Sequence, residues 1–149
     1  MGTLEEALAD HNIIGVDTMP FIYLWERHPH YLSLSESLFR YLKEPDVRGI
    51  TSLITLVEAC VLPQRQGRED LVQKYERILL HSRQVETLPI DAAVARRAIV
   101  LRARHNLRVP DSLQVAAALE AGATAFVTND RQLEKVPELA VLVLDDYLA

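Results

Sequence analysis

The chain has 149 residues, of which 49% are apolar and 25% charged, and its formal net charge is -5 at pH 7. This length suits one domain that buries roughly two-thirds of its unfolded surface without disulfides, and the acidic balance argues against a large phosphate-binding surface. No apolar stretch approaches the roughly 20 residues that cross a bilayer, and the single cysteine, Cys60, fits a reduced setting. We therefore expect a single domain over residues 1–149 in a soluble, cytoplasmic protein with no membrane partner.

Short apolar runs alternate with amphipathic stretches along the whole chain. The runs predict strands at 13–17, 47–51, 85–90, 124–128 and 139–144. The amphipathic stretches predict helices at 21–27, 32–43, 53–64, 69–83, 92–105, 111–121 and 132–136, with Asp91 and Gly122 as caps of two of them. This alternation is typical of an α/β fold with a mainly parallel five-stranded sheet between helices.

Four carboxylates occupy unusual places in this pattern. Asp17 and Asp130 follow predicted strands, Asp111 follows Pro110 at a helix start, and Glu58 interrupts the apolar segment 53–62. A lone buried carboxylate costs several kcal/mol unless it is paired or protonated, so converging carboxylates need a cation. Ligands of parallel sheets collect at the carboxyl ends of strands. We expect a site for Mg²⁺ or Mn²⁺, which prefer oxygen ligands, and phosphodiester hydrolysis is the chemistry that suits it best.

Each of these carboxylates also has a simpler interpretation. Asp17 and Asp111 fit helix N-caps, and Asp130 fits a turn or a cap for the helix at 132. Glu58 fits a pair with a core arginine. One shared site explains all four carboxylates, whereas the simpler interpretations need four separate explanations.

Two further features suggest binding surfaces. Residues 21–25 are five consecutive apolar residues on a short helix, which fits either core packing or a surface for a protein partner. Residues 91–110 carry one aspartate against five arginines, which fits either a basic patch or a solvated helix face.

The order of short motifs resembles PIN-domain ribonucleases. The motifs are Val16-Asp17-Thr18, Thr55-x-x-Glu58, Pro110-Asp111-Ser112-Leu113 and Val127-Thr128-Asn129-Asp130. The segment 107–119 followed by Gly122-Ala123 is especially similar to VapC-type toxins of toxin–antitoxin pairs. The resemblance covers residues 13–147, the expected core of the domain.

This resemblance implies a three-layer α/β/α sandwich and a Mg²⁺- or Mn²⁺-dependent endoribonuclease. It implies that Asp17, Asp111 and Asp130 bind the metal directly or through water, and that Glu58 holds a metal-bound water or a second cation. It places Thr128 and Asn129 in the pocket and Thr18 at its edge. The implied partners are an RNA substrate, a cognate antitoxin, and a second subunit in a homodimer or a toxin–antitoxin hetero-oligomer.

The chain departs from the family pattern at two places. Met19 stands where relatives often carry a small polar residue, and Arg131-Gln132-Leu133 replaces a turn that usually contains an aromatic residue. Neither departure removes a carboxylate, and both bear on substrate choice more than on activity.

Two other functions are compatible with the fold class. One is a catalytically silent RNA-binding or protein-binding module. The other is a receiver-like or phosphatase-like domain. Met19 breaks the Asp-x-Asp pattern of such domains, and Asp145-Asp146 lies too near the end of the chain for their usual order.

Overall fold

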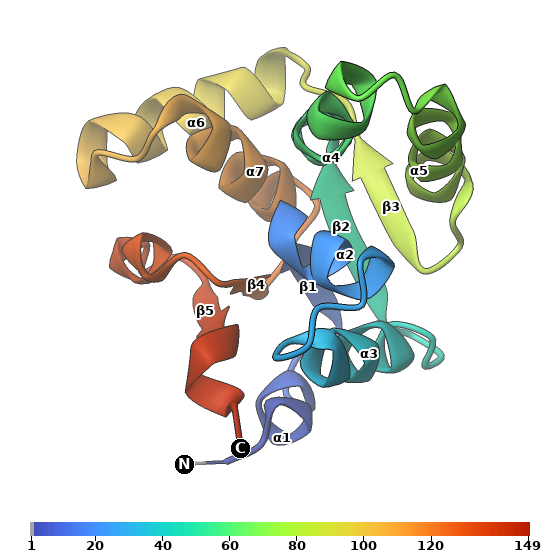
Figure 1. The fold of residues 1–149 in the computed structure, drawn as a ribbon. Coiled ribbons are helices and arrows are strands. Elements are labelled where there is room, and N and C mark those ends of the chain that lie inside the picture. Colours follow the sequence, from blue (N-terminus) through green and yellow to red (C-terminus); the bar gives the residue numbers. More distant parts are fainter. Residues whose placement is uncertain (1) are drawn as a thin grey trace.

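A five-stranded sheet, all of whose strands are parallel, forms the centre of the molecule (Figure 1). The computed structural model describes residues 2–149. The order across the sheet is β3-β2-β1-β4-β5. The strands are β1 (Ile13–Val16), β2 (Arg48–Ser52), β3 (Val85–Leu88), β4 (Ala125–Thr128) and β5 (Ala140–Val143). The expected parallel α/β sheet is confirmed, and β1 and β4 are neighbours in it.

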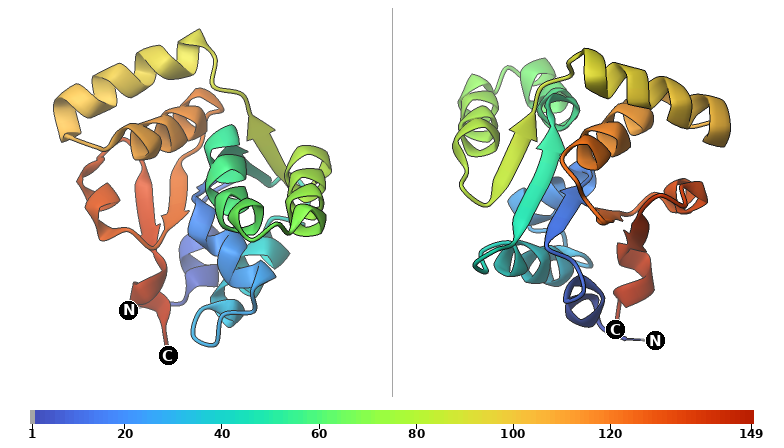
Figure 2. Two further views of the ribbon diagram at one scale, coloured as in Figure 1. Left: turned by 45° about the horizontal axis from the view of Figure 1, so that its top comes forward. Right: turned by 180° about the vertical axis from the view of Figure 1, so that it is seen from behind.

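Helices cover both faces of this sheet (Figures 1 and 2). One face carries α1 (Leu4–Leu8), α2 (Thr18–Trp25), α3 (Leu32–Tyr41) and α5 (Glu69–His81). The other face carries α7 (Val109–Glu120), with α6 (Ala92–His105) packed across it. Helix α4 (Leu53–Arg65) leaves the end of β2 and packs against α5, and the short 3₁₀ helices η1 (Arg131–Lys135) and η2 (Leu144–Tyr147) flank β5.

Alternation along the strands divides the apolar residues between two cores. Ile14 and Val16 face the core formed with α1, α2, α3 and α5. Phe126 faces the opposite core with α6 and α7, whereas its neighbours in β4 face the first. Successive strand residues point to opposite faces, so a sheet buried on both sides needs continuous apolar runs. That requirement explains the short apolar runs in the sequence.

Gly15 permits the close approach of α7 to the sheet. A Cβ atom at this position would lie 2.5 Å from Cδ1 of Phe126 and 2.7 Å from Cβ of Ala118. Gly122 ends α7 with φ +88°, the left-handed conformation expected after a helix. Gly15 therefore lets α7 pack closely on β1, and Gly122 marks the end of α7.

The structure corrects several sequence expectations. The short elements α1 and η2 lack a strong periodic pattern and were not predicted. Helix α7 begins at Val109, with Pro110 in its first turn and Arg108 as N-cap, so Asp111 is not the cap. Helix α4 is not a buried apolar helix, because Val57, Val61 and Leu62 are 38–58% exposed.

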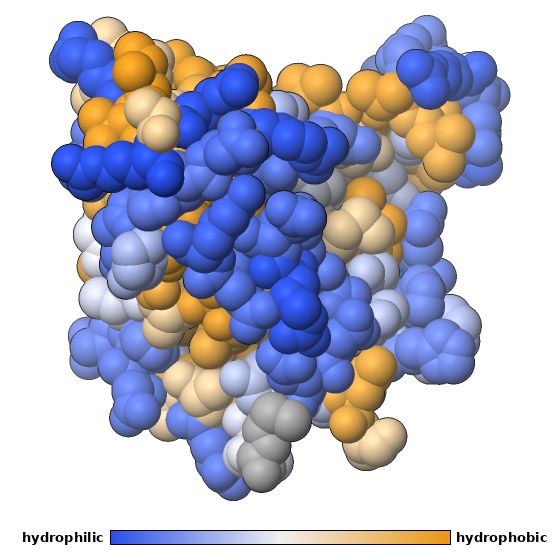
Figure 3. All heavy atoms as spheres, turned by 90° about the vertical axis from the view of Figure 1, so that its left-hand side faces the viewer, coloured by the Kyte–Doolittle hydropathy of each residue, from blue (hydrophilic) through white to orange (hydrophobic). Residues whose placement is uncertain are grey.

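The face that carries α6 and η1 is mostly hydrophilic, with apolar patches along its upper edge and smaller ones in its middle and lower part (Figure 3). On α6, Ile99 is 67% exposed and Val100 43%. The five arginines of the segment 91–110 are exposed, and Arg97 pairs with Glu120 while Arg108 pairs with Asp111. The predicted basic segment is thus partly neutralised. No helix within residues 2–149 is both long and apolar enough to span a membrane.

Candidate functional site

Asp17 lies at the carboxyl end of β1, where it caps α2. Its Oδ1 accepts a 2.8 Å hydrogen bond from the Thr18 backbone N–H, and its Oδ2 accepts a 2.7 Å bond from the Thr128 hydroxyl. Only 9% of the residue is exposed. Burial is the main cause that raises the pKa of the Asp17 carboxyl above its ordinary range; the two hydrogen bonds oppose it, and the charges of Asp111 and Glu58 reinforce it. The cap interpretation is confirmed, and the buried charge remains uncompensated.

Thr128 connects Asp17 to Asp130. The Thr128 hydroxyl, which is fully buried at the end of β4, donates to Asp17 and accepts a 3.0 Å bond from the Asp130 backbone N–H. The Asp130 carboxylate accepts from the Gln132 N–H at 3.0 Å and so caps η1. The cap interpretation of Asp130 is therefore confirmed as well. The capping bond uses Oδ1 of Asp130 and does not involve Oδ2.

Glu58 lies on the exposed side of α4, so the predicted burial of this residue is wrong. Its Oε1 accepts a 2.6 Å hydrogen bond from the hydroxyl of Thr18, the residue next to Asp17. The apolar neighbours of Glu58 in sequence do not indicate burial, because Val57, Val61 and Leu62 of α4 are themselves exposed. Glu58 nevertheless lies beside Asp17, as expected.

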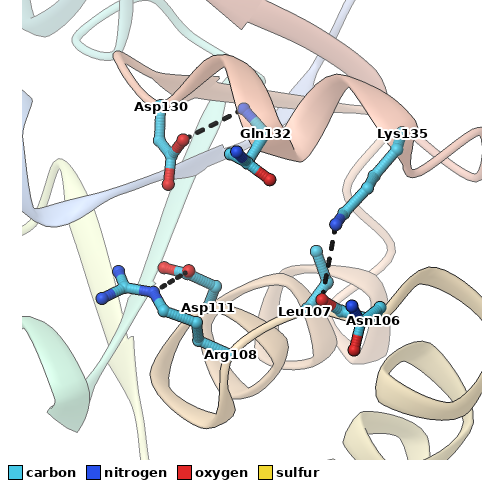
Figure 4. Close-up of a pocket in the computed structure, with 7 residues that line it drawn as sticks. All are labelled: Asn106, Leu107, Arg108, Asp111, Asp130, Gln132 and Lys135. Carbon is cyan, nitrogen blue, oxygen red and sulfur yellow. Dashed lines mark hydrogen bonds and ion pairs between the residues drawn. The ribbon is translucent and has the colours of Figure 1, made fainter.

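Asp111 and Asp130 line the same pocket, a hollow of about 290 Å³ between the start of α7 and η1 (Figure 4). Arg108 donates from Nε to Oδ2 of Asp111 at 3.0 Å, and this arginine side chain is 74% exposed. The bond to Asp111 and its charge raise the pKa of Arg108, with smaller contributions from Asp130 and Glu58. Lys135 lines the opposite side and donates to the Asn106 carbonyl at 3.3 Å.

All four carboxylates therefore gather at one end of the sheet. Hydrogen bonds through Thr18 and Thr128 tie Asp17 to Glu58 and to Asp130, and Asp111 shares a pocket with Asp130. Their roles as metal ligands stay a prediction.

Thr18, Thr128 and Asn129, which were expected in or at the edge of the pocket, are not among the residues that line the hollow between α7 and η1. Thr18 and Thr128 are 5% and 0% exposed, and each donates its proton to a carboxylate. Asn129 turns away from the four acids: it donates to the Tyr23 hydroxyl at 3.1 Å and accepts from the Asp145 N–H at 3.0 Å. Asn129 therefore joins the end of β4 to α2 and η2.

Gln114 on α7 was missed by the sequence analysis. It is 3% exposed and lies beneath the acidic cluster, where its amide contacts Asp17, Thr18, Thr55 and Ser52. The available signal was a single amide in the otherwise apolar run 113–119. A buried amide without partners costs a few kcal/mol, so such a residue indicates a polar network.

The donor set fits a hard divalent cation held with the help of water. The cluster offers carboxylate oxygens only, and the buried charge of Asp17 lacks a cationic partner among its hydrogen bonds. Within residues 2–149, no three acidic, histidine or cysteine side chains are grouped closely enough to hold one ion. Mg²⁺ suits such an arrangement, because it usually retains several waters and takes one or two protein carboxylates.

A second, more apolar hollow adjoins the site. It measures about 230 Å³ and lies between α2, α4 and α5, with Ile22, Trp25, Leu62, Tyr75 and Glu58 among its lining residues. The Trp25 and Tyr75 rings stack with centroids 4.3 Å apart. Glu58 thus belongs both to the lining of this apolar groove and to the acidic cluster.

Comparison with solved structures finds the same fold in several toxin–antitoxin proteins. The toxin VapC20 of Mycobacterium tuberculosis, described as cleaving the sarcin–ricin loop, is 20% identical with a TM-score of 0.67, over 87% of this chain and 98% of that one. A toxin–antitoxin complex from Klebsiella pneumoniae is 19% identical (TM-score 0.65, 88% and 96%). FitAcB from Neisseria gonorrhoeae is 19% identical (TM-score 0.64, 88% and 97%). At such identities the likeness establishes the fold alone.

The sequence itself gives a family match. No curated protein matches significantly. Residues 14–139 match the PIN domain family, and this range includes all four carboxylates. Because the match spans most of the chain and the fold agrees with it, the chain belongs to the PIN-domain family.

Proposed function

We propose that the protein is a Mg²⁺- or Mn²⁺-dependent endoribonuclease that cleaves RNA phosphodiester bonds and acts as the toxin of a toxin–antitoxin pair. The observation that carries this proposal is the gathering of four carboxylates at the ends of β1 and β4 and on α4 and α7. Thr18 and Thr128 link Asp17 to Glu58 and to the backbone of Asp130, and Asp111 lines a pocket with Asp130. A cluster of like charges with one buried member favours a cation, and membership of the PIN-domain family supports nuclease chemistry.

The proposed role of each residue follows from its place in the site. Asp17, Asp111 and Asp130 would hold the cation directly or through water, and Glu58 would orient a water at the exposed edge of the cluster. A bound Mg²⁺ or Mn²⁺ supplies charge compensation at the phosphate and lowers the pKa of an attacking water. Thr18 donates to Glu58 and thereby keeps that carboxylate turned towards Asp17. Thr128 donates to Oδ2 of Asp17 and thereby holds the Asp17 carboxylate in place.

The cations beside the acids support an anionic substrate. Arg108 and Lys135 line the pocket with Asp111 and Asp130, and exposed arginines continue along α6. Arginine binds phosphate oxygens through its planar fork, whereas lysine acts as a point charge. An RNA strand that crosses the pocket would thus meet the cations at its backbone and the carboxylates at the scissile phosphate. The toxin with the same fold that is described as cleaving the sarcin–ricin loop agrees with RNA as the substrate.

The apolar groove beside Glu58 supports a protein partner. Several neighbours of the same fold are toxin–antitoxin complexes. A cognate antitoxin segment with apolar side chains would fill the groove between α2, α4 and α5, next to the acidic cluster. The exposed Leu62 and the stacked Trp25–Tyr75 pair would form its contact surface, in a homodimeric or hetero-oligomeric assembly.

The direct test is cleavage of RNA by the purified chain. We expect cleavage with Mg²⁺ or Mn²⁺, no cleavage with a chelator, and a loss of cleavage on Asp17→Asn. Glu36→Gln, which removes an exposed carboxylate from α3, is the matched control and should leave cleavage unchanged. Cleavage that survives both chelation and Asp17→Asn rejects the proposal.

A catalytically silent RNA- or protein-binding module is the second candidate. It is favoured by the absence, within the described residues, of three potential ligands grouped around one point. RNA binding without Mn²⁺ binding would select it over the nuclease.

A further inference from the structure

Gln114 is the one strongly polar side chain in the run from Leu113 to Leu119 of α7. It is 3% exposed, yet both ends of its amide have partners. The Oε1 atom accepts from the Ser52 hydroxyl, and Nε2 donates to Thr55 at 2.8 Å. Longer contacts from Nε2 reach Thr18 at 3.3 Å and Asp17 at 3.4 Å. A buried amide whose oxygen and nitrogen both have hydrogen-bond partners is part of an ordered polar network.

The charge of Asp17 decides which way this amide points. With Nε2 towards Asp17, the amide offers its protons to a carboxylate oxygen. If the amide were reversed, Oε1 would face that oxygen, and two acceptors would repel each other. The Ser52 hydroxyl supports the same orientation, because it donates to Oε1 and accepts the Ile54 N–H at the start of α4.

The directions of the threonine hydroxyls agree with this orientation of the amide. Thr51 donates its proton to the Val16 carbonyl at 2.9 Å, so it accepts in its 2.7 Å contact with Thr55. Thr55 therefore donates to Thr51 and accepts from Gln114.

The same reasoning fixes the proton of Thr18. Its hydroxyl donates to Glu58 at 2.6 Å and accepts from Gln114. A hydroxyl carries one proton and two acceptor sites, so both bonds of Thr18 are compatible. With the Thr55 proton given to Thr51, the 3.2 Å contact between the Thr18 and Thr55 hydroxyls carries no proton and is not a hydrogen bond. Gln114 thus has direct contacts with Asp17 and with the hydroxyl that holds Glu58.

We propose that Gln114 is a positioning residue that holds Asp17 and Glu58 in one geometry for cation binding and hydrolysis. This inference rests on the proposed metal-dependent nuclease function and identifies the residue that positions two carboxylates of its site. Gln114 does not touch the substrate. It acts through Asp17 and Thr18, from a helix on the opposite face of the sheet to α2. Groups that orient metal ligands typically change metal affinity or activity by about 10–100-fold when removed.

The test compares wild type with Gln114→Met, which keeps the length of the side chain and removes its amide. We expect the Kd for Mn²⁺, measured by calorimetry, to rise about 10-fold and kcat for an RNA oligonucleotide to fall about 10–100-fold. KM should stay within about twofold, because the cations that would bind the backbone lie at the rim of the pocket. Gln73→Met, the same change at an exposed position of α5, should leave all three unchanged. Mn²⁺ affinity and kcat within twofold of wild type for Gln114→Met overturn the proposal.

A double-mutant cycle separates positioning from simple loss of stability. The effects of Gln114→Met and Glu58→Gln on Mn²⁺ affinity should be non-additive, because Gln114 acts partly through the hydroxyl bound to Glu58. Additive effects contradict that route. If wild type binds Mn²⁺ without cleaving RNA, the proposed function fails while the affinity cycle still decides the role of Gln114.

A measurement on the wild-type protein covers the case in which Gln114→Met does not fold. The side-chain amide protons of Gln114 should exchange slowly with solvent and shift when Mg²⁺ is added, as followed by NMR, whereas those of exposed Gln73 should do neither. Fast exchange and unchanged shifts at Gln114 overturn the proposal.

Discussion

The Thr128 hydroxyl donates a 2.7 Å hydrogen bond to Oδ2 of Asp17, which lies 111 positions earlier in the sequence. The register of the sheet makes this contact possible, because β1 and β4 are paired with Val16 opposite Val127. The residue after each partner therefore lies at the same edge. The motifs around Asp17 and Asp130 become one site through this pairing.

Replacing Asp17 by Asn should stabilise the metal-free protein. The side chain keeps its shape and its bond from the Thr18 N–H, and the buried charge is removed. The Thr128 hydroxyl, which donates to Oδ2 in wild type, must turn to accept from the new amide, and this reduces the gain. We expect Tm to rise by a few degrees in the presence of a chelator, since about 1 kcal/mol shifts Tm by roughly 2–4 °C at this chain length. Added Mn²⁺ should stabilise wild type and leave the variant unchanged. A lower Tm for the variant in chelator would contradict the burial argument.

The stability difference between these two proteins should depend on pH. Because the pKa of Asp17 is raised in the folded state, folding binds a proton between the unfolded pKa of about 3.9 and the raised value. Stability from this group is therefore fully present below about pH 3.9 and is lost as pH rises through the folded pKa. The advantage of Asp17→Asn should be largest at neutral pH and should shrink on acidification. Denaturant unfolding of both proteins from acidic to neutral pH measures this stability difference. A difference that does not change with pH would contradict a raised pKa of Asp17 in the folded state.

Glu58→Gln should affect activity without affecting stability. Glu58 is exposed, and a glutamine at this position still accepts the bond from Thr18. We expect Tm to stay within about 1–2 °C of wild type, because exposed substitutions usually change stability by less than about 0.5 kcal/mol. RNA cleavage should fall at least about 10-fold. Cleavage at the wild-type rate would remove Glu58 from the site.

Arg108→Ala should weaken RNA binding and make it less sensitive to salt. The exposed guanidinium lies beside Asp111 in the pocket, where it can contact a backbone phosphate. Loss of one phosphate contact reduces the slope of log K against log salt by about 0.7 for a single strand. Arg40→Ala on α3 is the charge-matched control. An unchanged slope for Arg108→Ala would place the RNA elsewhere.

Leu62→Asp should prevent inhibition by the proposed antitoxin and leave RNA cleavage intact. Leu62 is 54% exposed and lines the apolar groove, so a carboxylate at this position would be buried by any apolar segment that binds there. The measurement is RNA cleavage with and without the protein encoded next to this chain. Leu148→Asp, at a 44% exposed leucine near the C-terminus, is the control. Equal inhibition of Leu62→Asp and wild type would exclude this groove.

The sequence predicted the sheet and its long helices because buried parallel strands require short apolar runs, and these runs were visible. It also placed Asp17 and Asp130 together, because both follow strands whose carboxyl ends share an edge. It misjudged Glu58, since apolar composition does not reveal that α4 leaves its side exposed. The misplaced N-cap of α7 arose because Pro110 allows the helix to begin one residue before it.

The polar network beneath the acids was beyond prediction from the sequence. Gln114, Ser52 and Thr55 are separated by up to 62 residues and carry no shared spacing. Only the packing of α7 and α4 at the end of β2 brings them together. Asn129 was assigned to the pocket by its motif, yet the side chain turns towards Tyr23 and η2.

Calorimetric titration of the purified protein with Mn²⁺ tests the account most directly. If a divalent cation binds at the acidic cluster, wild type should bind Mn²⁺, and Asp17→Asn and Asp130→Asn, which alter the two carboxylates on either side of Thr128, should each weaken binding at least about 10-fold. Wild type that binds no Mn²⁺, or variants that bind it as tightly as wild type, would contradict the account.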